Sequence, residues 1–128
     1  MTKTRASRIL TREEILGISD FTFENVNTPE WGEDTFVRVR GLTAHERDTF
    51  ELTAVKEDFS GVTKAGMSDM RAHLVSMAVV DIDGRRLFTP EDIAALSTKN
   101  ALVIDRIFNV ARRLSGLSKE DVDELTKK

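Results

Sequence analysis

The chain has 128 residues, no cysteine, and a formal net charge of −3, with charged residues making up 32% of the sequence. This length suits a single domain with its own apolar core, and the lack of cysteine excludes a disulfide framework and any thiolate metal site. No apolar run approaches the roughly 18 residues that a membrane span needs, so we expect no membrane partner and a cytoplasmic location. Basic residues are scattered among carboxylates, which argues against a nucleic-acid partner.

The N-terminal segment is basic and precedes the first helix signal. We expect residues 1–9 to form a flexible basic arm and residues 10–126 to form a single α+β domain. The helix signal is Thr11-Arg12-Glu13-Glu14, a capping box in which the hydroxyl of Thr11 and the carboxylate of Glu14 each accept a backbone N–H at the helix start.

Two segments that alternate between apolar and polar residues follow. Residues 21–26 alternate loosely and residues 35–40 alternate well, and the loop between them contains Pro29 and Gly32. This pattern predicts a β-hairpin. Because a lone hairpin is only marginally stable, we expect it to pack on helices.

The remainder of the chain reads as helical. Capping signals begin at Thr43, at Thr89-Pro90 and at Ser118, and apolar stripes at helical spacing run through two further segments. The predicted helices cover residues 45–59, 68–80, a segment after Thr89, residues 101–114 and a segment after Ser118. The predicted fold is therefore α+β and mostly α, with a small β-hairpin near the N-terminus packed on a bundle of about four to six helices.

No arrangement of residues indicates catalysis, a cofactor or a metal. The segment Asp81-Ile82-Asp83-Gly84 resembles part of a calcium loop, but its register would place Val79 and Pro90 at the first and last ligand positions. Neither residue has a side-chain oxygen, so a tight turn is the better interpretation. His45 and His73 lie in different predicted helices, and there is no nucleophile elbow, phosphate loop or zinc-protease motif.

Two groups of residues are candidates for partner binding. Trp31 beside the hairpin turn is either a lid over the core or a contact residue, because tryptophan is enriched in binding hot spots. The methionine-rich helix face is either core or an adaptable binding surface. The candidate partner-binding residues are Trp31, Phe36, Met67, Met70, Leu74 and Met77.

Three segments together resemble the tail assembly chaperones of long-tailed bacteriophages, of the siphovirus type. The first is Leu10-Thr11-Arg12-Glu13-Glu14-Ile15-Leu16, the second runs from Pro29-Glu30-Trp31-Gly32 to Val37-Arg38-Val39-Arg40-Gly41-Leu42-Thr43-Ala44-His45-Glu46-Arg47-Asp48, and the third spans residues 81–125. Each segment is a capping and packing pattern, and their order and spacing carry the resemblance. The pair Arg85-Arg86 and the basic start depart from it.

This resemblance implies a non-catalytic protein of the host cytoplasm. Members of the family bind the tape-measure protein, keep it soluble, help to recruit tail-tube subunits, and leave the finished tail. Many are made in two lengths by a programmed frameshift, so a frameshift-extended form and self-association are further expected partners. The alternatives are a minor structural component of a tail or connector, and a small DNA-binding regulator whose affinity would fall steeply with salt.

Overall fold

The computed structural model describes residues 7–59 and 69–117. The predicted helix after Ser118 and most of the predicted arm, residues 1–6, lie outside these ranges. Along the described chain the elements are α1 (Arg12–Gly17), β1 (Phe23–Asn27), the 3-10 turn η1 (Pro29–Trp31), β2 (Phe36–Arg40), α2 (Ala44–Phe59), α4 (Met70–Ala78), β3 (Val79–Val80), η2 (Pro90–Asp92), α5 (Ile93–Leu96) and α6 (Ala101–Leu114).

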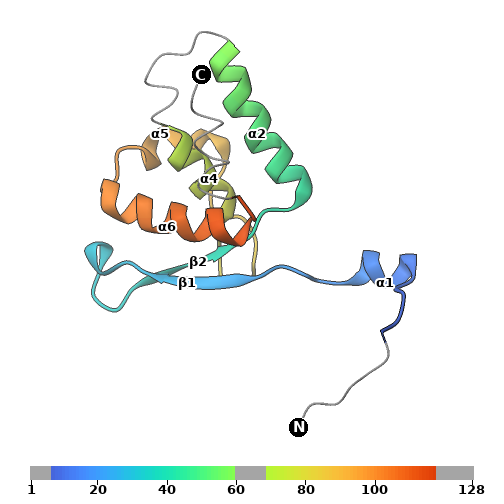
Figure 1. Cartoon of the computed structure of the whole chain (residues 1–128). Helices are drawn as coiled ribbons and strands as arrows, with labels where there is room; N and C mark the ends of the chain where they lie inside the picture. Colours follow the sequence, from blue (N-terminus) through green and yellow to red (C-terminus); the bar gives the residue numbers. More distant parts are fainter. Residues whose placement is uncertain (1–6, 60–68, 118–128) are drawn as a thin grey trace.

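The architecture has a sheet layer and a helical layer. The strands form an antiparallel sheet in the order β1-β2-β3, and Figure 1 shows α6 lying along one face with α4, α5 and α2 stacked beyond it on the same side. Helix α1 stands apart, at the end of an extended segment that continues the line of β1. The α+β, mostly α class predicted from the sequence is confirmed.

The helix starts follow the capping residues. In α1, the Thr11 N–H donates to Glu14 Oε1 at 2.9 Å and the Glu14 N–H donates to Thr11 Oγ1 at 3.2 Å. Thr43 and Glu46 make the same reciprocal pair before α2, at 2.9 and 3.0 Å. These bonds satisfy backbone donors that have no partner inside the helix.

The predicted helix over residues 68–80 is wrong at its end. Helix α4 stops at Ala78, and Val79 and Val80 form β3, pairing with Val39 and Arg38 of β2. Both valines are buried, and β-branched side chains suit a pleated surface better than a helix end. The sheet therefore has a third strand that the hairpin prediction did not include.

The predicted tight turn follows β3 directly. The Gly84 N–H donates to the Asp81 carbonyl at 2.9 Å, and Gly84 adopts a φ of 86°, a left-handed conformation that glycine tolerates without strain. The helix predicted after Thr89 is short. The 3-10 turn η2 is followed directly by α5, and α5 ends at Leu96.

The core lies between the sheet and the helices. Helix α4 is buried over most of its surface and packs against α6, while α6 covers β1 and β2. Buried apolar residues of this core are Val26, Val39, Phe50, Met70, Ala72, Leu74, Val75, Met77, Ala78, Val79, Leu96, Val103, Ile104, Ile107, Phe108, Ala111 and Leu117. None of the helices in the described ranges is long and apolar enough to cross a bilayer.

Candidate protein-binding surface

The two faces of the sheet differ in what covers them. Residues alternate between faces along a strand, so Val26 and Val39 point to α6 and are buried. Glu24 shares their side and binds Arg113 of α6 at 2.9 Å. The opposite side carries no described helix (Figure 1).

We call this opposite side the open face. It consists of Phe23, Asn25, Phe36 and Arg38 from β1 and β2, together with Ile82 and Leu87 from the turn after β3. These residues line one shallow depression of about 660 Å³. Phe36 is 56% exposed and Ile82 is 88% exposed, so the surface is rich in apolar groups that contact water.

A cation lies within this apolar surface. The guanidinium carbon of Arg38 lies 4.3 Å from the ring centroid of Phe23, and Arg40 lies 4.5 Å from the ring of Phe21 in the same manner. Stacking of this kind orients the aromatic ring and keeps a positive charge beside it. The open face thus offers aromatic carbon and cationic donors together, a composition typical of protein-binding hot spots.

The turn between β3 and Leu87 holds the aliphatic part of the open face in place. One carboxylate oxygen of Asp81 accepts the N–H groups of Asp83 and Arg85, at 2.8 and 3.0 Å. The hydrogen bond from the Arg85 N–H is the main cause that lowers the pKa of Asp81. The carboxylate therefore holds the backbone of the turn that carries Ile82.

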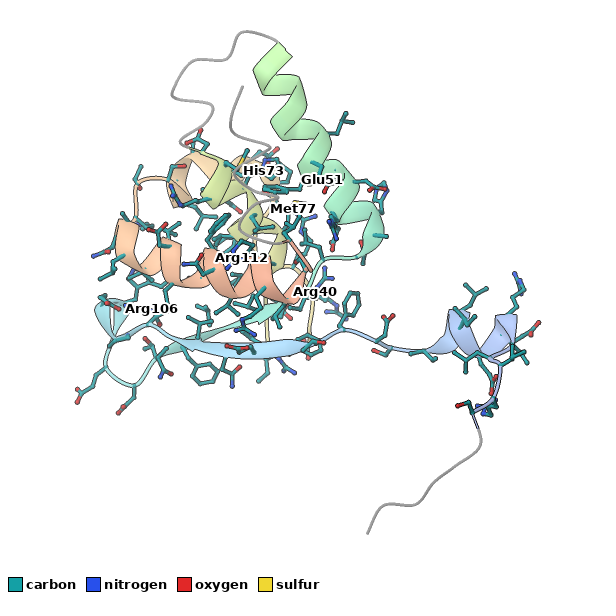
Figure 2. The ribbon with its side chains drawn as sticks, viewed as in Figure 1. Arg40, Glu51, His73, Met77, Arg106 and Arg112 are labelled. Atoms are coloured by element: carbon teal, nitrogen blue, oxygen red, sulfur yellow. The ribbon has the colours of Figure 1, made fainter. Side chains whose placement is uncertain are left out.

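The closed end of the hairpin is attached to α6. Arg106 binds both carboxylate oxygens of Glu30, at 2.9 and 2.8 Å, and donates to the carbonyl of Asn27 at 3.1 Å. Figure 2 shows Arg106 extending from α6 to this end of the hairpin. The hydrogen bond from Arg106 lowers the pKa of Glu30 to about 2. Trp31, 41% exposed, lies in η1 beside this attachment.

The residues predicted to bind a partner occupy two different environments. Phe36 and Trp31 are exposed at the hairpin, whereas Met70, Leu74 and Met77 are buried. These three side chains lie in the core, which was the alternative interpretation of the methionine-rich helix face. Met67 lies outside the described residues.

The histidines are not brought together. His45 is exposed in the first turn of α2, while the ring of His73 packs edge-on against Phe50 at 5.9 Å (Figure 2). Burial lowers the pKa of His73, and the nearby charge of Arg86 adds to this effect. Within residues 7–59 and 69–117 no three His, Asp or Glu side chains lie close enough to hold a metal ion.

Sequence reasoning missed Arg38, Ile82 and Leu87 as parts of this surface. The available signal was a second hairpin: two β-branched residues, Val79 and Val80, followed by an Asp-x-Asp-Gly turn and then Arg86 and Leu87. The structure pairs Val80 with Arg86 across this turn. The helical periodicity of the preceding residues outweighed that signal.

Comparison with known proteins gives the family. The sequence profile of the phage tail assembly chaperones matches residues 17–128. The fold is similar to the solved structure of the bacteriophage HK97 tail assembly chaperone, with a TM-score of 0.59 and 16% sequence identity over 84% of this chain and 95% of that chain. A comparison with curated protein sequences gives no match. Since the family profile covers most of the sequence, this chain belongs to the phage tail assembly chaperone family.

Proposed function

We propose that this chain is a non-catalytic chaperone that binds apolar helical segments of the tape-measure protein on its open face and helps to recruit tail-tube subunits in the host cytoplasm. The observation that carries the proposal is the open face itself: exposed Phe36, Ile82 and Leu87 around Arg38, on a chain of this family. An exposed apolar surface of this kind marks an interaction site in a soluble domain.

The physical task fits such a surface. A tape-measure protein is a long helix whose apolar stripes face water before the tail tube encloses it, and exposed stripes of this kind aggregate. A helix lying in the depression would bury its apolar stripe and place its own carboxylates near Arg38. Many weakly bound copies along one client would hold it through multivalency and would still release it to tube subunits.

Among the candidate contacts we retain Trp31 and Phe36, which are exposed. Met70, Leu74 and Met77 support the surface from below, since they are part of the core between α4, α6 and the sheet. Truncation of an exposed aromatic anchor should weaken client binding without unfolding the domain.

Co-expression with the tape-measure protein tests the proposal. We expect the wild-type chain to keep the client soluble and to co-purify with it in many copies. A triple variant, Phe36→Thr, Ile82→Asp and Leu87→Thr, should lose both effects, because threonine keeps strand propensity while removing apolar surface. The matched control is Leu102→Asp on α6, which replaces another exposed leucine (63%) away from the open face.

Two results would overturn the proposal. One is a triple variant that folds and solubilises the client as the wild type does. The other is the presence of the chain at stoichiometric level in purified tails, which would identify a structural component in place of a chaperone.

A further inference from the structure

The sheet has two edges, and the described chain covers one of them. At the β3 edge, the Leu87 N–H donates to the Val79 carbonyl at 3.0 Å and the Asp81 N–H donates to the Arg85 carbonyl at 2.8 Å. Residues 85–87 therefore occupy the outer side of β3. The other edge is β1, because the strand order is β1-β2-β3, and no described segment pairs with its outer side.

The pairing of β1 with β2 fixes which backbone groups of β1 point outward. The Thr28 N–H donates to the Thr35 carbonyl at 2.9 Å. In an antiparallel ladder, residues that bond to the partner strand alternate with residues whose N–H and C=O groups point the other way. Thr28 and every second residue before it therefore bond to β2. The residues between them, Phe23, Asn25 and Asn27, face the uncovered edge.

The outward groups of Phe23 and Asn25 are available to a further strand. Arg106 binds the Asn27 carbonyl at 3.1 Å, which closes this end of the edge, but no described residue binds the outward N–H and C=O groups of Phe23 or Asn25. Alternate residues of a strand are about 6.8 Å apart, and any extended backbone presents its own groups at this interval. The β1 strand also contains neither proline nor lysine, which natural sheets use to protect an exposed edge.

The charges around the edge select the side chains of such a strand. The guanidinium carbon of Arg38 lies 4.3 Å from the centroid of the Phe23 ring, so the Arg38 side chain reaches from β2 over β1. Within residues 7–59 and 69–117, no carboxylate forms an ion pair with Arg38. Glu24, the charged residue of β1, is bound by Arg113 on the helix side. A strand docked on β1 therefore meets an uncompensated cation, which acidic side chains complement.

We propose that the β1 edge binds an extended acidic segment of another protein, which becomes a fourth strand of the sheet. Main-chain hydrogen bonds to Phe23 and Asn25 supply the affinity, and acidic side chains beside Arg38 supply the selectivity. A helix cannot take this place, because its own backbone groups are already bonded within it. The inference therefore concerns a partner different from the helical client and does not rest on the proposed function.

The probe is a blocked peptide of about nine residues, long enough to span β1, in which glutamate alternates with valine. Nuclear magnetic resonance titration of the labelled full chain should show saturable shifts at the Phe23 and Asn25 amides, with a Kd below about 1 mM. These two amides should exchange with solvent at least about tenfold more slowly in the complex. A peptide with lysine in place of glutamate should bind at least about tenfold more weakly.

Two substitutions at Asn25 separate recognition of the backbone from recognition of the side chain. Asn25→Pro removes the outward N–H and keeps the bonds to β2, since an edge strand tolerates proline at such a position, and it should weaken peptide binding at least about tenfold. The matched control, Asn25→Thr, keeps the N–H and should bind within about twofold of the wild type. Arg38→Gln should weaken binding of the glutamate peptide and leave binding of a glutamine peptide unchanged.

Three results would rule the inference out: no saturable binding up to about 5 mM peptide, exchange of the Phe23 and Asn25 amides that bound peptide does not slow, or equal affinities of Asn25→Pro and Asn25→Thr. Protection of these amides before peptide is added would do the same, because the edge would then already be occupied. The exchange measurement needs only the wild-type chain, so it decides the matter even where Asn25→Pro does not fold.

Discussion

The guanidinium of Arg40 binds the carboxylate of Glu46 at 2.9 Å, joining the last residue of β2 to the first turn of α2. Arg40 also donates to the carbonyl of Gly41 at 3.2 Å, and the second oxygen of Glu46 accepts the Thr43 N–H at 2.9 Å. Arg86, after the β3 turn, lies 4.0 Å from the same carboxylate. One partly buried carboxylate thus ties the sheet, the turn that carries Leu87, and helix α2 together.

Replacing Glu46 by glutamine should destabilise the domain by about 3 kcal/mol, because it leaves the buried charge of Arg40 without its partner. Urea unfolding followed by circular dichroism measures the change. The matched control is Glu51→Gln on the same helix, whose pair with Arg47 at 3.3 Å is exposed and should contribute less than about 1 kcal/mol. Equal effects of the two substitutions would contradict this role for Glu46.

Stability should fall as the pH is lowered through the range in which Glu46 titrates. Burial alone raises the pKa of Glu46, but the Thr43 N–H and the Arg40 guanidinium outweigh it and hold the pKa below the ordinary 4.5. A folded pKa below the unfolded one gives stability that is present above about pH 4.5 and is lost as the pH falls through the folded pKa. The free energy of unfolding measured from about pH 6 to pH 3 should therefore vary less in Glu46→Gln than in the wild type.

The salt bridge at the closed end of the hairpin should persist to lower pH. Arg106 lowers the pKa of Glu30 to about 2, so the carboxylate stays ionised when most others are protonated. Nuclear magnetic resonance titration of the Glu30 carboxyl carbon should give a midpoint near this value in the wild type and a higher midpoint in Arg106→Gln, which loses the largest cause of the shift. A wild-type midpoint near 4.5 would mean that the pair does not form in solution.

Gly41 should not tolerate a side chain. A Cβ atom at this position would lie 2.6 Å from the backbone carbonyl oxygen of Leu114 in α6. Gly41→Ala should therefore cost about 1–3 kcal/mol, as overpacking does in a rigid region. Gly17→Ala is the matched control, because nothing lies within 4 Å of its added Cβ, and its thermal midpoint should stay close to that of the wild type.

The methionine face and the open face should respond differently to truncation. Met77 is a buried residue of α4, so Met77→Ala should destabilise the domain by about 2–5 kcal/mol. Phe36 is largely exposed, so Phe36→Ala should change stability by less than about 1 kcal/mol and reduce client binding instead. Chemical denaturation and client pull-down, performed on both variants, separate the two roles.

Much of this fold follows from local sequence. The capping pairs at Thr11 and Thr43 and the Asp81 turn are formed by residues a few positions apart, and such contacts need no knowledge of the tertiary structure. Helix α6, predicted at residues 101–114, has those bounds because its apolar stripe is regular. The hairpin of β1 and β2 was identified by its alternation and its turn residues.

What the sequence did not predict depends on contacts between distant segments. Val79 and Val80 form a strand because β2 lies beside them, some forty residues away in the sequence. The burial of Met70, Leu74 and Met77 on α4 depends on α6 and the sheet covering that helix. The exposure of Phe36 arises because no helix within residues 7–59 and 69–117 covers the other side of the sheet. Periodicity shows which residues share a face, but it does not show which face the rest of the chain covers.

Client binding at the open face is tested most directly by a nuclear magnetic resonance titration of the labelled chain with a helical fragment of the tape-measure protein. Shift changes should concentrate at Phe23, Phe36, Arg38, Ile82 and Leu87, with Leu102 and the exposed side of α2 unchanged. Binding that shifts the helical side and leaves the open face unchanged would contradict this assignment, and so would a soluble fragment that produces no shifts at saturating concentration.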